Sequence, residues 1–130
     1  MARVLLVSFA GYPYTPSSLM PDNGMANLAG ELLRAGHDAR ICDYGTIDTM
    51  RRLYPPELGR RVEQTIAAAL SGRKPGLRGL AAVVRTDWRL GRIKKRVYAE
   101  VAEEVLAAAH DFGADAIGFK LWNGDGFEGT

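Results

Sequence analysis

Two segments rich in glycine and aromatic residues are the parts of this sequence best suited to bind a ligand. Each follows a short apolar run typical of a buried strand, at 3–9 and 115–122. Glycine lets a ligand approach the backbone, and aromatic rings offer flat apolar surfaces. The residues expected to bind are Gly11, Tyr12, Tyr14, Pro21, Asn23, Gly24, Lys120, Trp122, Asn123 and Gly124. Their aromatic rings suit a large, mostly apolar ligand. A helix beginning at Asn23 would add free N–H groups, which suit amide and phosphate groups on that ligand.

The sequence shows no set of catalytic residues. His37 and His110 are expected at helix ends, where a histidine commonly has a structural role. No serine lies in a Gly-x-Ser-x-Gly motif, which argues against a hydrolase of that type. The segment 11–24 lacks the glycine spacing of dinucleotide-binding and P-loop proteins. We therefore expect binding rather than catalysis from this chain alone.

Metal-ligating residues are equally sparse. The single cysteine, Cys42, excludes a disulfide within the chain and a cysteine-rich metal site, and it fits a small buried side chain in a strand. Asp22, Asp43 and Asp125 are expected near strand ends, but acidic residues are common there in α/β proteins. We expect no protein-ligated metal.

The elements that position these residues alternate between strands and helices. A strand, a helix and a second strand within about forty residues predict a right-handed parallel crossover. Prolines between the first strand and the first helix exclude regular structure there. The expected elements are a strand at 3–9, a helix from 22 or 23 to Gly36, a strand at 39–44, a helical insertion at about 46–92, a helix beyond it that ends at Gly113, and a strand at 115–122. This order predicts an α/β fold of the flavodoxin-like (Rossmann-like) type, a parallel sheet with flanking helices.

The sequence ends where the next helix of such a fold is due. We therefore expect residues 1–130 to form a single α/β domain that is the N-terminal part of a larger protein, with a sheet incomplete at its C-terminal side. The third strand would then be an apolar edge strand, through Ile117, Phe119 and Leu121. Since an exposed edge can pair with another chain, we expect self-association of the 130-residue chain.

Composition is that of an ordinary soluble domain, with 47% hydrophobic and 25% charged residues. No apolar run is long enough to cross a membrane and no secretory leader is present, so we expect a cytoplasmic protein without a membrane partner. Residues 51–96 hold 13 of the 17 Lys and Arg and only three acidic residues, a net charge of +10. Such a stretch can bind nucleic acid, an acidic protein or a phosphate-bearing ligand, or can simply be a solvated face.

The segment from Pro21 to Asp38, PDNGMANLAGELLRAGHD, followed by Ile41-Cys42-Asp43-Tyr44, resembles the start of a cobalamin-binding domain of the type that precedes a radical S-adenosylmethionine domain. The likeness covers residues 3–45 well and 97–127 moderately. It implies a flavodoxin-like sheet whose strand-end loops hold the lower face and nucleotide tail of a corrinoid. The corrinoid would be the ligand, and a C-terminal radical domain of the same parent chain would be the partner.

Two positions differ from the best-known cobalamin domains. Aligning the family's loop glycine with Gly24 places Pro21 where those domains carry the histidine that ligates cobalt. Lys120 stands where the family has the serine of its Ser-x-Leu motif. The resemblance thus implies cobalamin bound without a histidine ligand, as is frequent in the radical-enzyme branch.

Two hypotheses from different classes follow. The first is a cobalamin-binding domain of a radical enzyme, a methyltransferase or cyclase, whose S-adenosylmethionine and 4Fe-4S cluster belong to the missing C-terminal part. The second is a flavodoxin-like regulatory or interaction module whose basic 51–96 segment binds an acidic partner or, less expected, nucleic acid.

Overall fold

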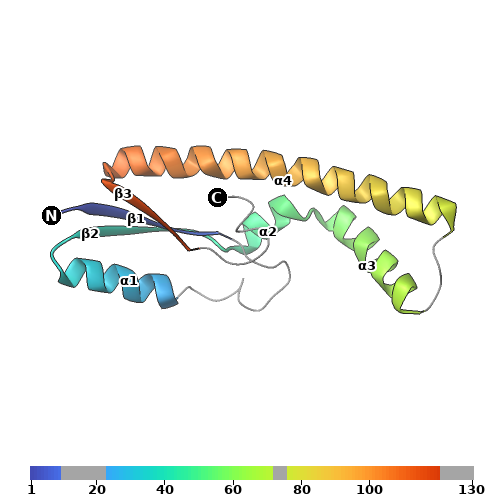
Figure 1. Cartoon of the computed structure of the whole chain (residues 1–130), viewed down its shortest axis with the longest axis horizontal. Helices are drawn as coiled ribbons and strands as arrows, with labels where there is room; N and C mark the ends of the chain where they lie inside the picture. The colour runs from blue at the N-terminus through green and yellow to red at the C-terminus, as the bar shows by residue number, and fades with distance from the viewer. Residues whose placement is uncertain (10–22, 72–75, 121–130) are drawn as a thin grey trace. The chain divides into compact units, whose positions relative to one another are not determined.

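The computed structural model describes residues 1–9, 23–71 and 76–120 (Figure 1). Three strands and four helices occur in this part of the chain. They are β1 (Arg3–Phe9), α1 (Asn23–Arg34), β2 (Asp38–Tyr44), α2 (Ile47–Leu53), α3 (Pro56–Leu70), α4 (Leu77–Phe112) and β3 (Ala116–Lys120). The backbone groups into two compact units, Met1–Met50 with Tyr98–Thr130, and Arg51–Val97. A single domain spanning 1–130 remains a prediction.

The first unit contains a parallel sheet with the strand order β2-β1-β3. β1 lies in the centre, with Ser8 opposite Asp43 of β2 and opposite Lys120 of β3. The α/β class and the parallel crossover expected from the sequence are therefore confirmed. The bounds of β1 agree with the expected 3–9, whereas β2 begins one residue earlier than expected.

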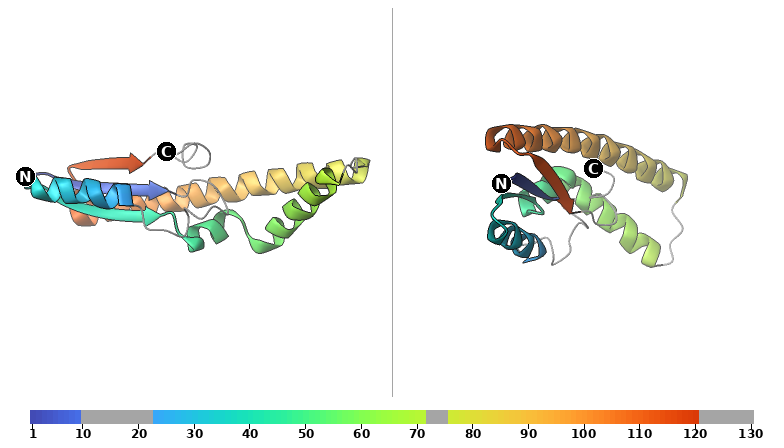
Figure 2. Two further views of the ribbon diagram at one scale, coloured as in Figure 1. Left: turned by 90° about the horizontal axis from the view of Figure 1, so that it is seen from below. Right: turned by 60° about the vertical axis from the view of Figure 1, so that its left-hand side comes forward.

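Alternation of side chains along β1 builds two cores, because successive residues of a strand point to opposite faces. Leu6 faces α1, where it packs with Met25 and Ala29. Val7 and the other odd-numbered residues of β1 face the C-terminal part of α4. Figure 2 shows α1 and α4 on opposite sides of the strands. The continuous apolar run of β1 thus reflects burial on both faces.

Glycine ends both helices that flank the sheet. Gly36 has φ 82° and Gly113 has φ 63°, the left-handed conformation that glycine adopts without steric penalty. After α1, the N–H of His37 donates to Leu32 O at 2.9 Å, and the N–H of Gly36 donates to Leu33 O at 3.0 Å. The same pair of bonds follows α4, so each helix ends in a Schellman motif that turns the chain into the next strand.

The helix before β3 is longer than the sequence suggested. We expected an insertion ending near 92, but α4 runs without a break from Leu77 to Phe112. The residues in its first half that disfavour a helix most are Gly79 and Gly91, which cost about 1 kcal/mol each relative to alanine, and neither is followed by proline. The insertion is therefore helical as expected, but no helix ends near 92, and the division between the two units falls within α4, after Val97.

The second unit consists of the end of α2, α3 and the first part of α4. Leu53, Leu58 and Val97 are its buried apolar side chains among the described residues. The ammonium of Lys94 lies 5.2 Å from the centre of the Tyr54 ring, within cation–π range.

Candidate functional site

A row of polar residues crosses the sheet at its carboxyl end. Ser8 stands between Asp43 and Lys120, each the opposite residue on a neighbouring strand. Residues opposite one another in a parallel sheet point to the same face, so all three belong to the face that carries α1. Strands lie about 4.8 Å apart, which places the Cα atoms of Asp43 and Lys120 about 10 Å from each other. An acid, a hydroxyl and an ammonium group thus share one line across the strand ends.

The turn after β2 holds the acidic end of this row in place. The backbone N–H of Gly45 donates to Oδ1 of Asp43 at 2.8 Å. A side chain at Gly45 would put its Cβ 3.0 Å from that oxygen, so the turn accommodates glycine best. Thr46 then caps α2, because its Oγ1 accepts the N–H of Thr49 at 3.3 Å. The carboxylate of Asp43 is therefore oriented by backbone geometry.

The opposite face of the sheet carries an apolar hollow of about 320 Å³. Its floor comes from β1 and β3, and its wall comes from α4. Phe9 and Tyr98 meet edge to face there, with ring centres 5.6 Å apart. The lining residues are Val7, Phe9, Tyr98, Val101, Ala102, Val105, Leu106, Ile117 and Phe119. The volume lies at the lower end of the range for small-molecule pockets.

This hollow was not predicted from the sequence, although one signal for it was present. Ile117 and Phe119 alternate along β3 and both remain exposed. We assigned them to an edge strand, but their side chains also line a concavity under α4. Recognising it required knowing that Phe9 of β1 lies on the same face, which is a tertiary property.

Three of the predicted binding residues lie in the described part of the chain. Asn23 and Gly24 begin α1 and are exposed, and Lys120 ends β3. Because α1 returns antiparallel to β1, its N-terminus faces the carboxyl end of the sheet (Figure 1). The other predicted residues lie outside the described residues: Gly11, Tyr12, Tyr14, Pro21, Trp122, Asn123 and Gly124.

The two expected binding segments begin after adjacent strands. Phe9 and Lys120 are the last described residues before them, and each is the final residue of its strand. Since β1 and β3 are parallel neighbours, both strands end at the same edge of the sheet. This is the position that a strand-end ligand site requires.

His37, His110 and Cys42 are three further titratable side chains of the described residues, and their surroundings differ. His37 accepts the backbone N–H of Ala2 through Nδ1 at 3.1 Å, which ties the end of α1 to the chain before β1. His110 is exposed, with Nδ1 3.9 Å from a carboxylate oxygen of Asp111. Burial raises the pKa of the Cys42 thiol, with a smaller opposing effect of Arg40, so this cysteine is held as a thiol.

No group of three metal-ligating side chains comes together within residues 1–9, 23–71 and 76–120. Over the same ranges, no helix combines the length and apolar character that crossing a bilayer would need.

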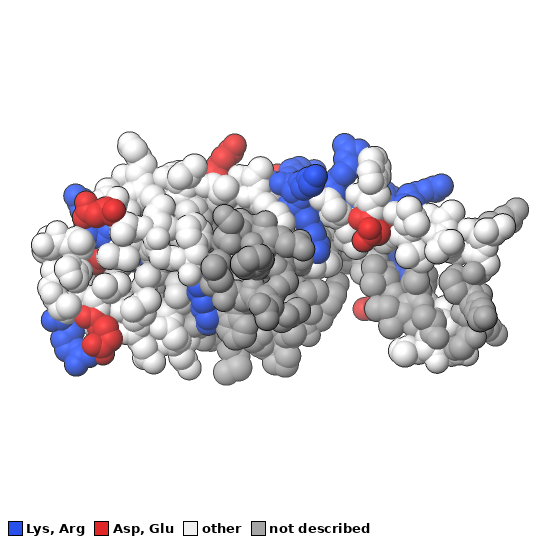
Figure 3. All heavy atoms as spheres, in the orientation of Figure 1, with Lys and Arg blue, Asp and Glu red and all other residues white. Residues whose placement is uncertain are grey.

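The basic segment forms the second unit, on the end of α2, on α3 and on the first part of α4. Figure 3 shows Lys and Arg side chains gathered over this part of α4. Comparison of the chain with protein-family models, with curated proteins and with solved structures gives no match.

Proposed function

We propose that this chain is a flavodoxin-like cobalamin-binding domain of the type that precedes a radical S-adenosylmethionine domain. By this proposal the chain binds the corrinoid and presents it to a C-terminal domain of the same parent protein. The parent enzyme would be a methyltransferase or a cyclase.

One observation carries the proposal: the strand order β2-β1-β3 brings Phe9 and Lys120 to one edge, next to the N-terminus of α1. The segment that resembles cobalamin domains, 21–44, contains α1 and β2 and therefore borders that edge. In open parallel sheets, ligands bind in the crevice beyond the carboxyl ends of the strands. The resemblance and the topology thus point to the same place.

The described residues at this edge fit the chemistry of a corrinoid. The ligand is large, with an apolar body, peripheral amides and a phosphate in its nucleotide tail. Lys120 and the N–H groups of Asn23 and Gly24, which have no partner within α1, suit the amides and phosphate, whereas the hollow beside Phe9 offers apolar surface. When bound, the corrinoid would supply the carbon-transfer chemistry, and the residues of this chain would orient it and exclude water.

Cobalt ligation by a histidine of this chain is not part of the proposal. Pro21 occupies the ligand position of the best-known domains, His37 is bonded to Ala2, and His110 is exposed at the end of α4. His37→Ala and His110→Ala should therefore leave the absorption spectrum of bound cobalamin unchanged. Loss of a histidine-ligated spectral form in either variant would contradict this.

Titration of the 130-residue chain with hydroxocobalamin, followed by equilibrium dialysis and visible absorption, tests the main claim. We expect saturable binding that Lys120→Ala weakens about tenfold or more, since a hydrogen bond to a charged group contributes about 1.5–3 kcal/mol. Gly24→Val should also weaken it by blocking close approach to the helix N-terminus. Arg89→Ala removes a positive charge from the second unit and serves as the matched control.

Two results would overturn the proposal. One is failure of the folded wild-type chain to retain cobalamin, with folding checked by circular dichroism. The other is equal affinity of wild type, Lys120→Ala and Gly24→Val, which would place any corrinoid away from this edge.

A further inference from the structure

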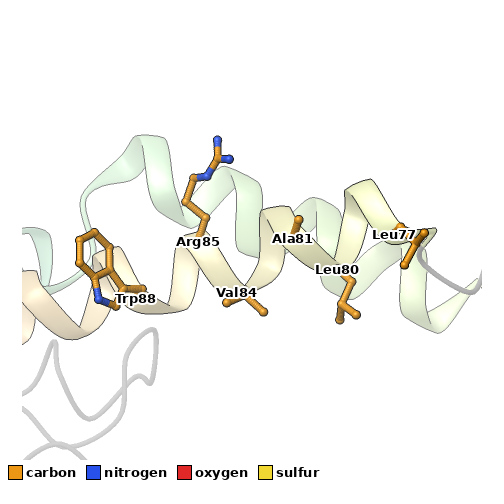
Figure 4. A pocket seen from close by; sticks show the side chains of 6 residues that line it. All are labelled: Leu77, Leu80, Ala81, Val84, Arg85 and Trp88. Atoms are coloured by element: carbon orange, nitrogen blue, oxygen red, sulfur yellow. The ribbon is translucent and has the colours of Figure 1, made fainter.

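The first half of α4 carries a stripe of large apolar side chains that face solvent. Leu77 is 89% exposed, Leu80 54%, Val84 62% and Trp88 61%. With Ala81 and Arg85 they form one continuous open surface. Figure 4 shows Leu80 and Val84 on one side of the helix, with the guanidinium group of Arg85 extending to another. Contiguous exposed apolar surface of this kind marks an interaction site.

The spacing of the stripe is that of a helix–helix interface. Positions 77, 81, 84 and 88 are separated by four, three and four residues, which is the spacing of a heptad repeat with 81 and 88 at a and 77 and 84 at d. At 1.5 Å per residue the seam is about 17 Å long. A partner helix could therefore bury this stripe along about three turns.

The charges beside the stripe select the partner. In this heptad, Arg85 and Arg92 both take the e position, where charged residues pair across a helix–helix interface. The guanidinium of Arg92 lies 4.9 Å from the centre of the Trp88 ring, at the border of the apolar surface. Residues 77–97 contain seven Lys and Arg against the single acidic residue Asp87, a net charge of +6. A second copy of this chain would bring a like charge of +6 to the seam, whereas an acidic helix would neutralise it.

We propose that this stripe of α4 binds an acidic amphipathic helix of a partner protein. The partner would pack leucine-like residues against the seam and place carboxylates opposite Arg85 and Arg92. This inference does not rest on corrinoid binding, which concerns the other unit.

The arrangement favours such a helix over two other anionic partners. A nucleic acid gains little from four exposed apolar side chains, because its affinity comes mainly from phosphate contacts. An anionic membrane favours basic residues on both borders of the apolar face, whereas Asp87 takes the g position on the border away from Arg85 and Arg92. From Leu77 to Arg92 one border is basic, whereas the other carries Asp87 and no Lys or Arg, which indicates pairing with a single helix.

The test uses two synthetic 21-residue peptides with leucine at every a and d position. One carries glutamate at e and g, and the other carries lysine. Fluorescence anisotropy of the labelled acidic peptide with the full chain should show saturable binding that weakens as salt is added. The lysine peptide should not bind.

Variants of α4 distinguish binding at the seam from nonspecific electrostatic attraction to the basic helix. Val84→Glu and Arg85→Glu should each weaken binding of the acidic peptide at least tenfold. Arg89→Glu makes the same charge change as Arg85→Glu on the same helix, but at a b position outside the seam, and should weaken it less than threefold. Circular dichroism confirms that the variants stay helical, and cobalamin retention by Arg85→Glu should equal that of wild type, which separates this proposal from the previous one.

Four outcomes would overturn the inference. They are equal losses for Arg85→Glu and Arg89→Glu, equal binding of the two peptides, binding to anionic lipid vesicles or to duplex DNA without binding to the acidic peptide, and a concentration-dependent dimer of the chain that Val84→Glu abolishes. The last would assign the stripe to a second copy.

Discussion

Replacing each of the two glycines that end α1 and α4 tests how these helix ends support the sheet. An alanine forced into the left-handed conformation costs about 1–2 kcal/mol. At Gly36, φ 82°, a new Cβ would meet nothing within 4 Å, so Gly36→Ala should lower the free energy of unfolding by that amount alone. At Gly113, φ 63°, the new Cβ would lie 2.8 Å from Nη1 of Arg3, which donates to the carbonyl oxygen of Phe112 at 3.2 Å.

The extra cost at Gly113 should be small. Arg3 Nη1 is the far end of a flexible, exposed side chain, so it can move away and lose only that hydrogen bond. A hydrogen bond contributes about 0.5–1.5 kcal/mol, and an exposed one lies at the low end. We therefore expect Gly113→Ala to cost about 0.5 kcal/mol more than Gly36→Ala.

Urea unfolding followed by far-UV circular dichroism measures both changes. Repeating them in an Arg3→Ala background should make the two glycine replacements equally costly, because the only contact that distinguishes them is gone. The reasoning fails if Gly36→Ala leaves stability unchanged, or if the difference between the two sites persists without the Arg3 side chain.

Three further predictions concern the sheet. Leu6→Ala should lower the free energy of unfolding by about 2–5 kcal/mol in urea titrations, because Leu6 is buried against α1, whereas Leu33→Ala, at a side chain 56% exposed, should cost well under half of that. Phe119→Lys should reduce self-association of the chain through the exposed edge of β3, and light scattering measures this change. A wild-type chain that stays monomeric at high concentration would contradict the expectation. The raised pKa of Cys42 predicts slow alkylation of its thiol at neutral pH, and alkylation as fast as that of a free thiol would refute this. It also predicts that the free energy of unfolding falls as pH rises above about 8.5, because the thiol of the unfolded chain ionises at a lower pH than that of the folded chain.

Local chemistry explains which elements could be predicted from the sequence. β1 was predictable because an unbroken apolar run has few alternatives to a strand buried on both faces. The end of α1 was predictable because Gly36 terminates the helical periodicity. The length of α4 was not predictable. Apolar side chains in its first half are exposed to solvent, so this half lacks the pattern of a helix packed on a core.

The candidate site was predictable only in outline, for a related reason. Residues after two strands can be placed at one edge as soon as the strands are assigned as parallel, which is why the segments after the first and third expected strands were both included. The sequence did not show that Ser8 would lie directly opposite both Asp43 and Lys120, because the register of the strands depends on how α1 and α4 cover the two faces.

The alternation of β1 also explains why the carboxyl edge presents two different surfaces. Ser8 and Phe9 are consecutive residues, so they must point to opposite faces. Ser8 joins the polar row on the α1 side, and Phe9 joins the apolar hollow on the α4 side. A shift of β1 by one residue would exchange the two, placing the serine in the hollow and the phenylalanine between Asp43 and Lys120. The apolar contacts of Leu6 with α1 oppose such a shift, so the packing of the core also fixes which chemistry each side of the site presents.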